Sequence, residues 1–285
     1  MTPPRTCLIA TLALALVGCA SHLGRPDGPA AERVDSSRHE LRRDLVYTPA
    51  GWPQALKADV YLPGTPDLRP GVLLIHGGGW EGPDRRAQMA AIAERLVQRG
   101  YVVMNASYRF APDYRYPAPV DDLHQALRWL RARAAAFRLR EDRIAAFGYS
   151  AGGHLAEMLG VTGDPALRVQ AVVAGGAPSD LRKYPGGRLV PQFLGGSRSE
   201  IPQAFAAASP ITRVAAGQPP VFLYHGSWDQ LVPYDHATDY QKALSAAGIP
   251  NELFTLRGRG HVTAFLSDGA AVDAALDFLD RWLRR

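Results

Sequence analysis

The 285-residue chain is poor in cysteine, and its N-terminal apolar run is too short to cross a membrane. The two cysteines lie at positions 7 and 19, and the run from Cys7 to Val17 covers about eleven residues, whereas a spanning helix needs roughly 20. Basic residues outnumber acidic ones by five, but they are scattered and not interleaved with aromatic residues, which argues against a nucleic-acid partner. No group of Cys, His and Glu has the spacing of metal ligands, so we expect no metal and no other cofactor.

The N-terminus is typical of an exported protein. Arg5 precedes the apolar run, which has the length of a signal-peptide core. The run ends in Leu16-Val17-Gly18-Cys19, which resembles the lipobox of bacterial lipoproteins, where the cysteine is diacylated and becomes the mature N-terminus. We therefore expect a signal peptide over residues 1–18 and a membrane anchor through lipid on Cys19. Because Ala20 follows and not aspartate, the expected location is the bacterial cell envelope, at the periplasmic side of the outer membrane. The alternative is an ordinary secretory signal with a chance cysteine.

The remaining sequence predicts a tether followed by one α/β domain. Residues 19–37 have no apolar periodicity and are predicted to be a tether, and residues 38–285 form the domain. Short apolar runs alternate there with helical patterns, which predicts a mostly parallel central sheet with helices on both faces. The first two predicted strands form an antiparallel pair, and residues 177–217, rich in Pro and Gly, are predicted to form a small lid. The predicted strands are 44–48, 56–62, 72–75, 101–105, 144–147, 169–174, 221–224 and 252–256, and the clearest helices lie around 89–97, 120–130 and 272–279.

The most informative motif is Gly148-Tyr149-Ser150-Ala151-Gly152. It follows the apolar run 143–147 and precedes the helix-like run 155–159, so it lies on a strand-to-helix turn, as a nucleophile elbow does. A turn this sharp requires glycine on both sides of the serine, because larger side chains there would collide. The alternative is a serine that only caps a helix, which the pentapeptide alone does not exclude.

A second glycine-rich turn, His76-Gly77-Gly78-Gly79-Trp80, follows the apolar run 72–75. Glycine leaves main-chain N–H groups unobstructed, and acyl transfer needs such donors for the oxyanion of its tetrahedral intermediate. We expect the N–H groups of Gly78, Gly79 and Ala151 to form this oxyanion hole. A merely flexible loop would not explain the flanking histidine and tryptophan.

A candidate acid and a candidate base follow the serine. Asp229 lies on a loop after the apolar run 221–224, and His261 lies on a loop loosened by glycine, before the last helix. The chain order Ser, Asp, His is that of α/β-hydrolases and differs from the order in chymotrypsin-like and subtilisin-like enzymes. We therefore expect Ser150 to be the nucleophile, His261 the general base, and Asp229 the acid that orients the histidine.

Other acidic and aromatic residues have alternative interpretations. Asp180 follows a strand end and is the reserve candidate for the acid, while Asp235 and Asp239 fall inside a helical pattern. Trp80 and Trp228 flank the predicted site and either line its pocket or pack in the core. Asp121 and Asp122 lie at a predicted helix start and are interpreted as helix caps.

With these motifs in place, the chain resembles a known family over residues 55–285. It is similar to the α/β-hydrolase carboxylesterases with an HGGG oxyanion loop, the group around the hormone-sensitive-lipase-like esterases, which also carry stretches like 105–112 and 116–122. Trp80 after the glycines is more similar to a compact branch that includes carbohydrate acetyl- and feruloyl-esterases and arylformamidases. No long helical segment precedes the first strands, so the cap of the larger hormone-sensitive-lipase-like enzymes is not expected.

The sequence and the resemblance together predict a serine carboxylesterase. It would hydrolyse short-chain acyl esters through a Ser-His-Asp triad and an acyl-enzyme intermediate. The substrate would be an ester of a small molecule or of a carbohydrate, including acetylated or feruloylated carbohydrates. An amidase or arylformamidase on the same triad is one alternative, because the triad does not choose between ester and amide. A lipid-anchored binding protein without catalysis on a hydrolase fold is the other. The oligomeric state does not follow from the sequence.

Overall fold

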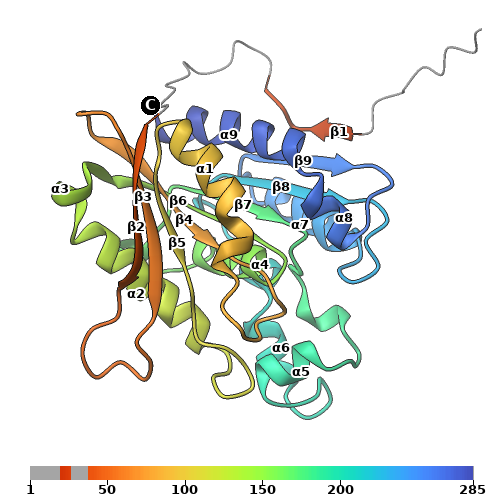
Figure 1. The fold of residues 1–285 in the computed structure, drawn as a ribbon. Coiled ribbons are helices and arrows are strands. Elements are labelled where there is room, and N and C mark those ends of the chain that lie inside the picture. The colour runs from red at the N-terminus through yellow and green to blue at the C-terminus, as the bar shows by residue number, and fades with distance from the viewer. Residues whose placement is uncertain (1–19, 27–37, 285) are drawn as a thin grey trace, which may run out of the picture.

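The computed structural model describes residues 20–26 and 38–284, which build one nine-stranded sheet covered by helices (Figure 1). The spatial order of the strands is β1-β9-β8-β7-β6-β4-β5-β3-β2. Their bounds are β1 Ala20–Leu23, β2 His39–Val46, β3 Lys57–Pro63, β4 Arg69–Ile75, β5 Val102–Ala106, β6 Leu139–Tyr149, β7 Ala171–Gly175, β8 Val221–Gly226 and β9 Asn251–Leu256.

The centre of the sheet is parallel, as predicted. Strands β5, β4, β6, β7, β8 and β9 pair in parallel, and most of their residues are buried, because helices cover both faces. The predicted opening pair is antiparallel, with β2 on β3 and β3 on β5. The α/β fold class is therefore confirmed. The carboxyl ends of the parallel strands meet at one edge, which is where such sheets place their functional loops.

Alternate residues of the strands face two separate apolar layers. In β4, Leu73 and Ile75 pack into the layer that contains α2, α4 and α7, whereas Val72 and Leu74 pack into the layer that contains α1 and α9. This period of two is what a sheet buried on both faces requires. The helix bounds are α1 Ala90–Gln98, α2 Ala118–Arg131, α3 Ala134–Phe137, α4 Ala151–Gly160, α7 Asp235–Ala246, α8 His261–Leu266 and α9 Gly269–Leu283.

Residues 177–217 form a compact insertion with little regular structure. It contains the short helices α5 (Leu189–Leu194) and α6 (Pro202–Ala207) and two single 3₁₀ turns. Figure 1 shows α5 and α6 standing apart from the sheet. Phe193 and Phe205 are fully buried and join this insertion to the layer of α2, α4 and α7.

The tether predicted over residues 19–37 is wrong for its first residues, because Ala20–Leu23 form β1. This strand pairs antiparallel with β9, and His22 Nε2 lies 2.8 Å from Oε2 of Glu252. The strand shields the edge of β9, whose main-chain groups would otherwise have no partner on that side. Cys19 and residues 1–18 and 27–37 lie outside the described residues. None of the helices in the described segments has the length and apolar character needed to cross a bilayer.

Candidate active site

Ser150 lies on the sharp turn between β6 and α4. Its φ of 56° and ψ of −123° are unusual for a residue with a side chain, and such strain is common at functional positions. The turn is held by main-chain hydrogen bonds: the N–H of Ser150 donates to the carbonyl of Gly175 at 2.7 Å, and the N–H of His154 donates to the carbonyl of Ser150 at 3.0 Å. The hydroxyl is thereby fixed above the carboxyl end of the sheet.

The glycines on either side of this turn have a steric role. A Cβ on Gly148 would lie 2.1 Å from the carbonyl oxygen of Gly152, and a Cβ on Gly152 would lie 2.2 Å from the carbonyl oxygen of Ile75. Both distances are far below van der Waals contact and involve main chain that cannot move aside. The geometry of the turn therefore requires glycine at both positions.

The structure brings Ser150, His261 and Asp229 into one line of hydrogen bonds. Nε2 of His261 lies 2.8 Å from Oγ of Ser150, and Nδ1 of His261 lies 2.6 Å from Oδ2 of Asp229. The three residues come from the end of β6, the loop after β8 and the start of α8. This arrangement lets the histidine accept the serine proton while the carboxylate fixes its tautomer.

Asp229 is buried and strongly held in its charged form. Burial alone would raise the pKa of this carboxyl, but hydrogen bonds from His225, His261 and the N–H of Val232 outweigh it and hold the pKa far below its usual range. Oδ1 accepts the N–H groups of Leu231 at 3.0 Å and Val232 at 2.8 Å. The carboxylate is therefore immobile and ionised throughout the physiological range.

His225 is a contact of this site that the sequence analysis missed. Its Nε2 lies 3.3 Å from Oδ2 of Asp229 and 2.8 Å from the carbonyl oxygen of Val232. The only signal in the sequence is a histidine four residues before the acid, at the end of a buried strand. Asp229 is thus in contact with two histidines, one of which faces the serine.

Tyr149, immediately before the serine, positions the loop of His261. Its hydroxyl donates to the carbonyl oxygen of His261 at 2.6 Å, and its ring packs against the imidazole with centroids 5.3 Å apart. The ring also packs against Phe265 of α8, with centroids 4.8 Å apart. Tyr149 is the last residue of β6 and Ser150 follows it directly, so this tyrosine connects the nucleophile to the start of α8.

The predicted oxyanion loop lies directly against the serine turn. A Cβ on Gly77 would lie 2.9 Å from the carbonyl oxygen of Tyr149, and Gly78 and Gly79 have φ values of 116° and 64°. Within the described residues, the N–H groups of Gly78, Gly79 and Ala151 donate to no protein acceptor. Gly79 and Ala151 line the cavity beside Ser150, whereas Gly78 faces the side chain of Arg85.

Two buried histidines hold this loop from behind. His76 stacks on Tyr108 with centroids 4.7 Å apart, and burial lowers the pKa of His76 to about 4. His154 accepts the indole N–H of Trp80 at 3.2 Å and donates to the carbonyl oxygen of Ala208 at 2.7 Å, with a pKa that burial lowers to about 4. Both are therefore neutral near pH 7, and they orient main chain and Trp80.

The segment 105–112 supports the same loop from below. The hydroxyl of Tyr108 donates to the carbonyl of His76 at 3.1 Å, and the N–H of Ala111 donates to the carbonyl of Trp80 at 2.9 Å. Arg109 is held by Asp122, which accepts its N–H and Nε–H at 2.8 Å. Asp122 is therefore a buried partner of this segment and not a helix cap as predicted.

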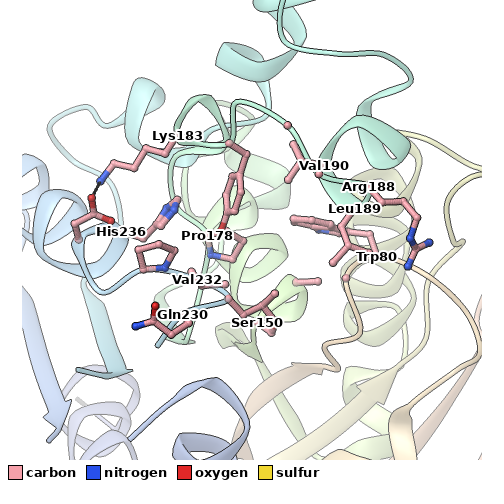
Figure 2. Close-up of a pocket in the computed structure, with 18 residues that line it drawn as sticks. Trp80, Ser150, Pro178, Lys183, Arg188, Leu189, Val190, Gln230, Val232 and His236 are labelled. Atoms are coloured by element: carbon pink, nitrogen blue, oxygen red, sulfur yellow. Dashed lines mark ion pairs between the residues drawn. The ribbon is translucent and has the colours of Figure 1, made fainter. Parts of the chain in front are cut away.

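A cavity of about 730 Å³ opens beside Ser150 (Figure 2). One wall comes from the insertion 177–217, which contributes Tyr184, Leu189 and Val190, so the predicted lid does cover the site. The opposite wall is the loop that follows Asp229, including Leu231. Apolar side chains dominate this lining, as in many small-molecule sites.

Charged and polar groups of the lining are mostly paired with neighbouring side chains. Lys183 forms ion pairs with Asp235 at 2.9 Å and Asp239 at 2.7 Å, and Arg188 pairs with Glu81, its Nη2 lying 3.0 Å from Oε2. These pairs connect the lid to α7 on one side and to the oxyanion loop on the other. Asp235 and Asp239, weaker candidates for the acid, thus have other partners.

The reserve acid Asp180 does not contact His261. Its carboxylate accepts hydrogen bonds from Arg182 at 2.8 and 2.9 Å and caps the 3₁₀ turn 181–183. Trp80, by contrast, lines the cavity and stacks on Phe193 of the lid at 4.5 Å. Trp228 was predicted either to line the pocket or to pack in the core, and both predictions are wrong. The residue is 70% exposed and does not line the cavity.

The sequence of the chain is similar to those of known esterases. Residues 58–244 match the BD-FAE family model. The chain is 31% identical to Esterase LipC of Mycobacterium tuberculosis, over 85% of this chain and 64% of LipC. It is 28% identical to the isoprenylcysteine alpha-carbonyl methylesterase ICME of Arabidopsis thaliana, over 80% of this chain and 58% of that protein. The chain thus spans about three fifths of the length of these relatives.

Solved structures share the fold over most of the chain. A truncated carbohydrate esterase from gut microbiota superimposes with a TM-score of 0.77 at 22% identity, covering 90% of this chain and 99% of that one. Butyrate-bound esterase Est2 of Thermogutta terrifontis superimposes with a TM-score of 0.72 at 26% identity, covering 85% and 94%. Together with the strand order and the serine turn, these matches show that the chain belongs to the BD-FAE family and has the α/β-hydrolase fold.

Proposed function

We propose that the protein is a serine carboxylesterase. The observation that carries the proposal is the line of hydrogen bonds in which His261 joins Ser150 at 2.8 Å and Asp229 at 2.6 Å. The relatives named above are esterases, and the chain covers only part of their length, so their activity supports the proposal without deciding the substrate.

The proposed reaction begins with attack of Ser150 Oγ on the ester carbonyl carbon. Nε2 of His261 takes the hydroxyl proton, and the imidazolium that forms is stabilised by Asp229 through Nδ1–H. The N–H groups of Gly78, Gly79 and Ala151 would stabilise the oxyanion, and one such donor lowers the activation barrier by about 3 to 4 kcal/mol. His261 then returns the proton to the leaving alcohol, and the acyl group remains on Ser150.

The second half of the proposed reaction repeats these roles with water. His261 removes a proton from water as it attacks the acyl-enzyme, and the proton returns to Ser150 when the carboxylic acid leaves. Asp229 keeps its charge in both halves. This agrees with the depressed pKa of its carboxyl, which burial opposes and the hydrogen bonds around it produce.

For the substrate we propose esters of short acyl groups, of two to about six carbons, with acetylated carbohydrates as the natural class. Feruloylated carbohydrates, whose larger aromatic acyl group exceeds this range, are the alternative. Trp80 is held by Phe193 and His154 beside the serine, so it limits the depth available to an acyl chain. The lid also places the polar side chains of Lys183, Tyr184 and Arg188 at the cavity, where they would lie near the alcohol part of the ester. A carbohydrate esterase and a butyrate-bound esterase among the similar structures support this choice.

The experiment that tests the activity is labelling with a fluorophosphonate probe. Wild-type protein should label at one site, and Ser150→Ala should abolish both labelling and p-nitrophenyl acetate hydrolysis while leaving thermal stability nearly unchanged. Ser199→Ala, at an exposed serine of the lid, is the matched control and should label normally. A folded protein that never labels would support the alternative of a non-catalytic binding protein. Faster hydrolysis of an N-formyl anilide than of the matching ester would support the amidase alternative.

We also propose that the protein is a lipoprotein anchored through Cys19 in the outer membrane and facing the periplasm. The proposal rests on Leu16-Val17-Gly18-Cys19 behind an apolar run of signal-peptide length. Expressed in a bacterium, the protein should incorporate labelled palmitate and sediment with outer membranes, and Cys19→Ser should lose the label. Wild-type protein found without lipid in the soluble periplasmic fraction would contradict this.

A further inference from the structure

Exposed apolar side chains gather beside the mouth of the cavity. Within residues 20–26 and 38–284, seven large hydrophobic residues are conspicuously exposed, and four of them lie on the two segments that carry Asp229 and His261. Their exposed fractions are 70% for Trp228, 54% for Leu231, 63% for Val262 and 76% for Leu266. We call these four residues, with Arg257 and Arg259, the Trp228 face.

The two segments of the Trp228 face are joined to each other. The N–H of Trp228 donates to the carbonyl oxygen of Arg259 at 2.9 Å, and the carboxylate of Asp229 is bound to His261 directly beside it. Val262 and Leu266 are four residues apart on α8, so they share one side of that helix. Leu231 also lines the cavity, so the face is continuous with the entrance of the site.

The Trp228 face carries unbalanced positive charge. Arg257 and Arg259 are exposed, and neither forms an ion pair with any described residue. Of the acids nearest in sequence, Asp229 is buried against His261, Asp235 pairs with Lys183, and Glu252 pairs with His22 and Arg281. Asp268, two residues after Leu266, is half-buried, and burial raises the pKa of its carboxyl to about 6, so it offsets the two arginines only in part. Exposed tryptophan and leucine beside unpaired arginine are the side chains that favour the interface of an anionic bilayer.

The position of β1 places this face close to the predicted lipid anchor. In the antiparallel register of β1 and β9, Ala20 pairs with Leu256, the residue directly before Arg257. Ala20 directly follows Cys19 in the sequence. Figure 1 shows β1 running along β9, with α8 near the carboxyl end of β9. A lipid on Cys19 would therefore enter the membrane beside the Trp228 face, with no intervening tether.

We propose that the Trp228 face docks onto the surface of an anionic lipid bilayer, so that the cavity opens next to the membrane. Trp228, Val262 and Leu266 would enter the interfacial layer, and Arg257 and Arg259 would bind lipid phosphates. The proposal extends the proposed function, because esters held at the bilayer surface would reach Ser150 without crossing the aqueous phase. It does not depend on the ester being a lipid.

Quenching of tryptophan fluorescence by brominated lipid tests this directly. The full chain is reconstituted into vesicles of dibromo-phosphatidylcholine, with or without phosphatidylglycerol, and compared with its Trp228→Phe variant, which isolates one of the five tryptophans. We expect Trp228-dependent quenching in vesicles that contain phosphatidylglycerol. Arg257→Gln and Arg259→Gln should each lower the docked-to-undocked ratio about fivefold. Arg43→Gln, an exposed arginine on β2 at the opposite edge of the sheet, is the matched control and should change nothing.

Three results would overturn the proposal. One is an absence of Trp228-dependent quenching in every vesicle, and another is equal quenching with and without phosphatidylglycerol. The third is a Trp228 signal that responds to soluble xylan but not to vesicles, which would assign the face to a polymeric substrate. Hydrolysis of p-nitrophenyl acetate, measured in parallel in detergent, reports on the proposed esterase separately, so failure of docking and failure of the activity are distinguishable.

Discussion

Nε2 of His225 lies 3.3 Å from Oδ2 of Asp229, the same oxygen that contacts His261 at 2.6 Å. One carboxylate oxygen therefore joins two imidazoles, only one of which reaches the serine. His225 makes no contact with Ser150, so it would act on the reaction by holding Asp229 in place and in its charged form.

Replacing His225 should weaken the site without abolishing it. His225→Leu removes the hydrogen bond of Nε2 to the carbonyl oxygen of Val232 at 2.8 Å and its contact with the buried carboxylate of Asp229 at 3.3 Å. A hydrogen bond to a charged group is worth about 1.5 to 3 kcal/mol of stability, and we expect kcat to fall about tenfold with little change in KM. His225→Gln keeps a donor near the position of Nε2 and should restore most of the activity. Equal losses in both variants would show that the imidazole shape, and not the hydrogen bond, matters.

The two candidate acids can be separated by matched substitutions. Asp229→Asn should lower kcat by about four orders of magnitude, because an amide favours the wrong tautomer of His261. Asp180→Asn removes a partner of Arg182 on the lid and should keep activity within a few-fold of wild type. Steady-state kinetics with p-nitrophenyl acetate decides, and the reverse ranking would mean that the acid is misassigned.

The glycines of the serine turn should tolerate no side chain. Gly152→Ala forces a Cβ to within 2.2 Å of main chain, and we expect loss of folded protein or a fall of several kcal/mol in the free energy of unfolding. Gly163→Ala is the control, since a Cβ added there would meet nothing within 4 Å and the φ of this residue is not positive. That variant should be neutral or slightly more stable in urea titrations.

Glu157 should make stability depend on pH. It is completely buried on α4, accepts a hydrogen bond from Ser179 at 3.0 Å, and its pKa is raised well above the usual value by burial. The folded state therefore binds a proton that the unfolded state releases above about pH 4.5, so this residue costs up to about 1.4 kcal/mol of stability per pH unit as the pH rises. Glu157→Gln should raise the melting temperature at pH 8 and leave it unchanged near pH 4. A shift of equal size at both pH values would contradict a protonated glutamic acid.

Acyl-chain length tests the proposed substrate class. Each methylene that stays in water forgoes about 0.8 kcal/mol, so chains longer than the space beside Trp80 should gain no further kcat/KM. We expect the specificity constant to peak at acetate or butyrate and to fall at octanoate and palmitate. Trp80→Ala should move the optimum toward longer chains, and a wild-type optimum at octanoate or beyond would identify a deep acyl tunnel instead.

Much of the fold follows from local patterns in the sequence. Short apolar runs predict the parallel strands because those strands are buried on both faces, and the predicted run 144–147 lies inside the longer β6. β1 was missed because its four residues, Ala20-Ser21-His22-Leu23, contain no continuous apolar run of the kind that marks the buried strands. It forms through main-chain pairing with β9, which depends on the sheet already being there.

The site was partly predictable for a similar reason. Motifs identify Ser150, Asp229 and His261 as candidates, but their contacts depend on loops that meet only in the folded chain. Trp228 and Asp229 show how little the sequence reveals about burial on such a loop. The two residues are adjacent, yet Asp229 is buried and Trp228 is 70% exposed. His225 and Tyr149 act on main chain and on neighbours far away in sequence, so spacing alone does not reveal them.

The hydrogen bonds of His154 have a consequence for how such proteins diversify. His154 belongs to the helix behind the nucleophile, yet it joins Trp80 of the oxyanion loop to Ala208 at the end of α6. The lid is therefore not an interchangeable module. An ancestor that acquired a new lid, or an engineer who grafts one, would have to change His154, Trp80 and Phe193 together. Replacing the lid alone would leave the neutral imidazole of His154 buried without its hydrogen-bond acceptor.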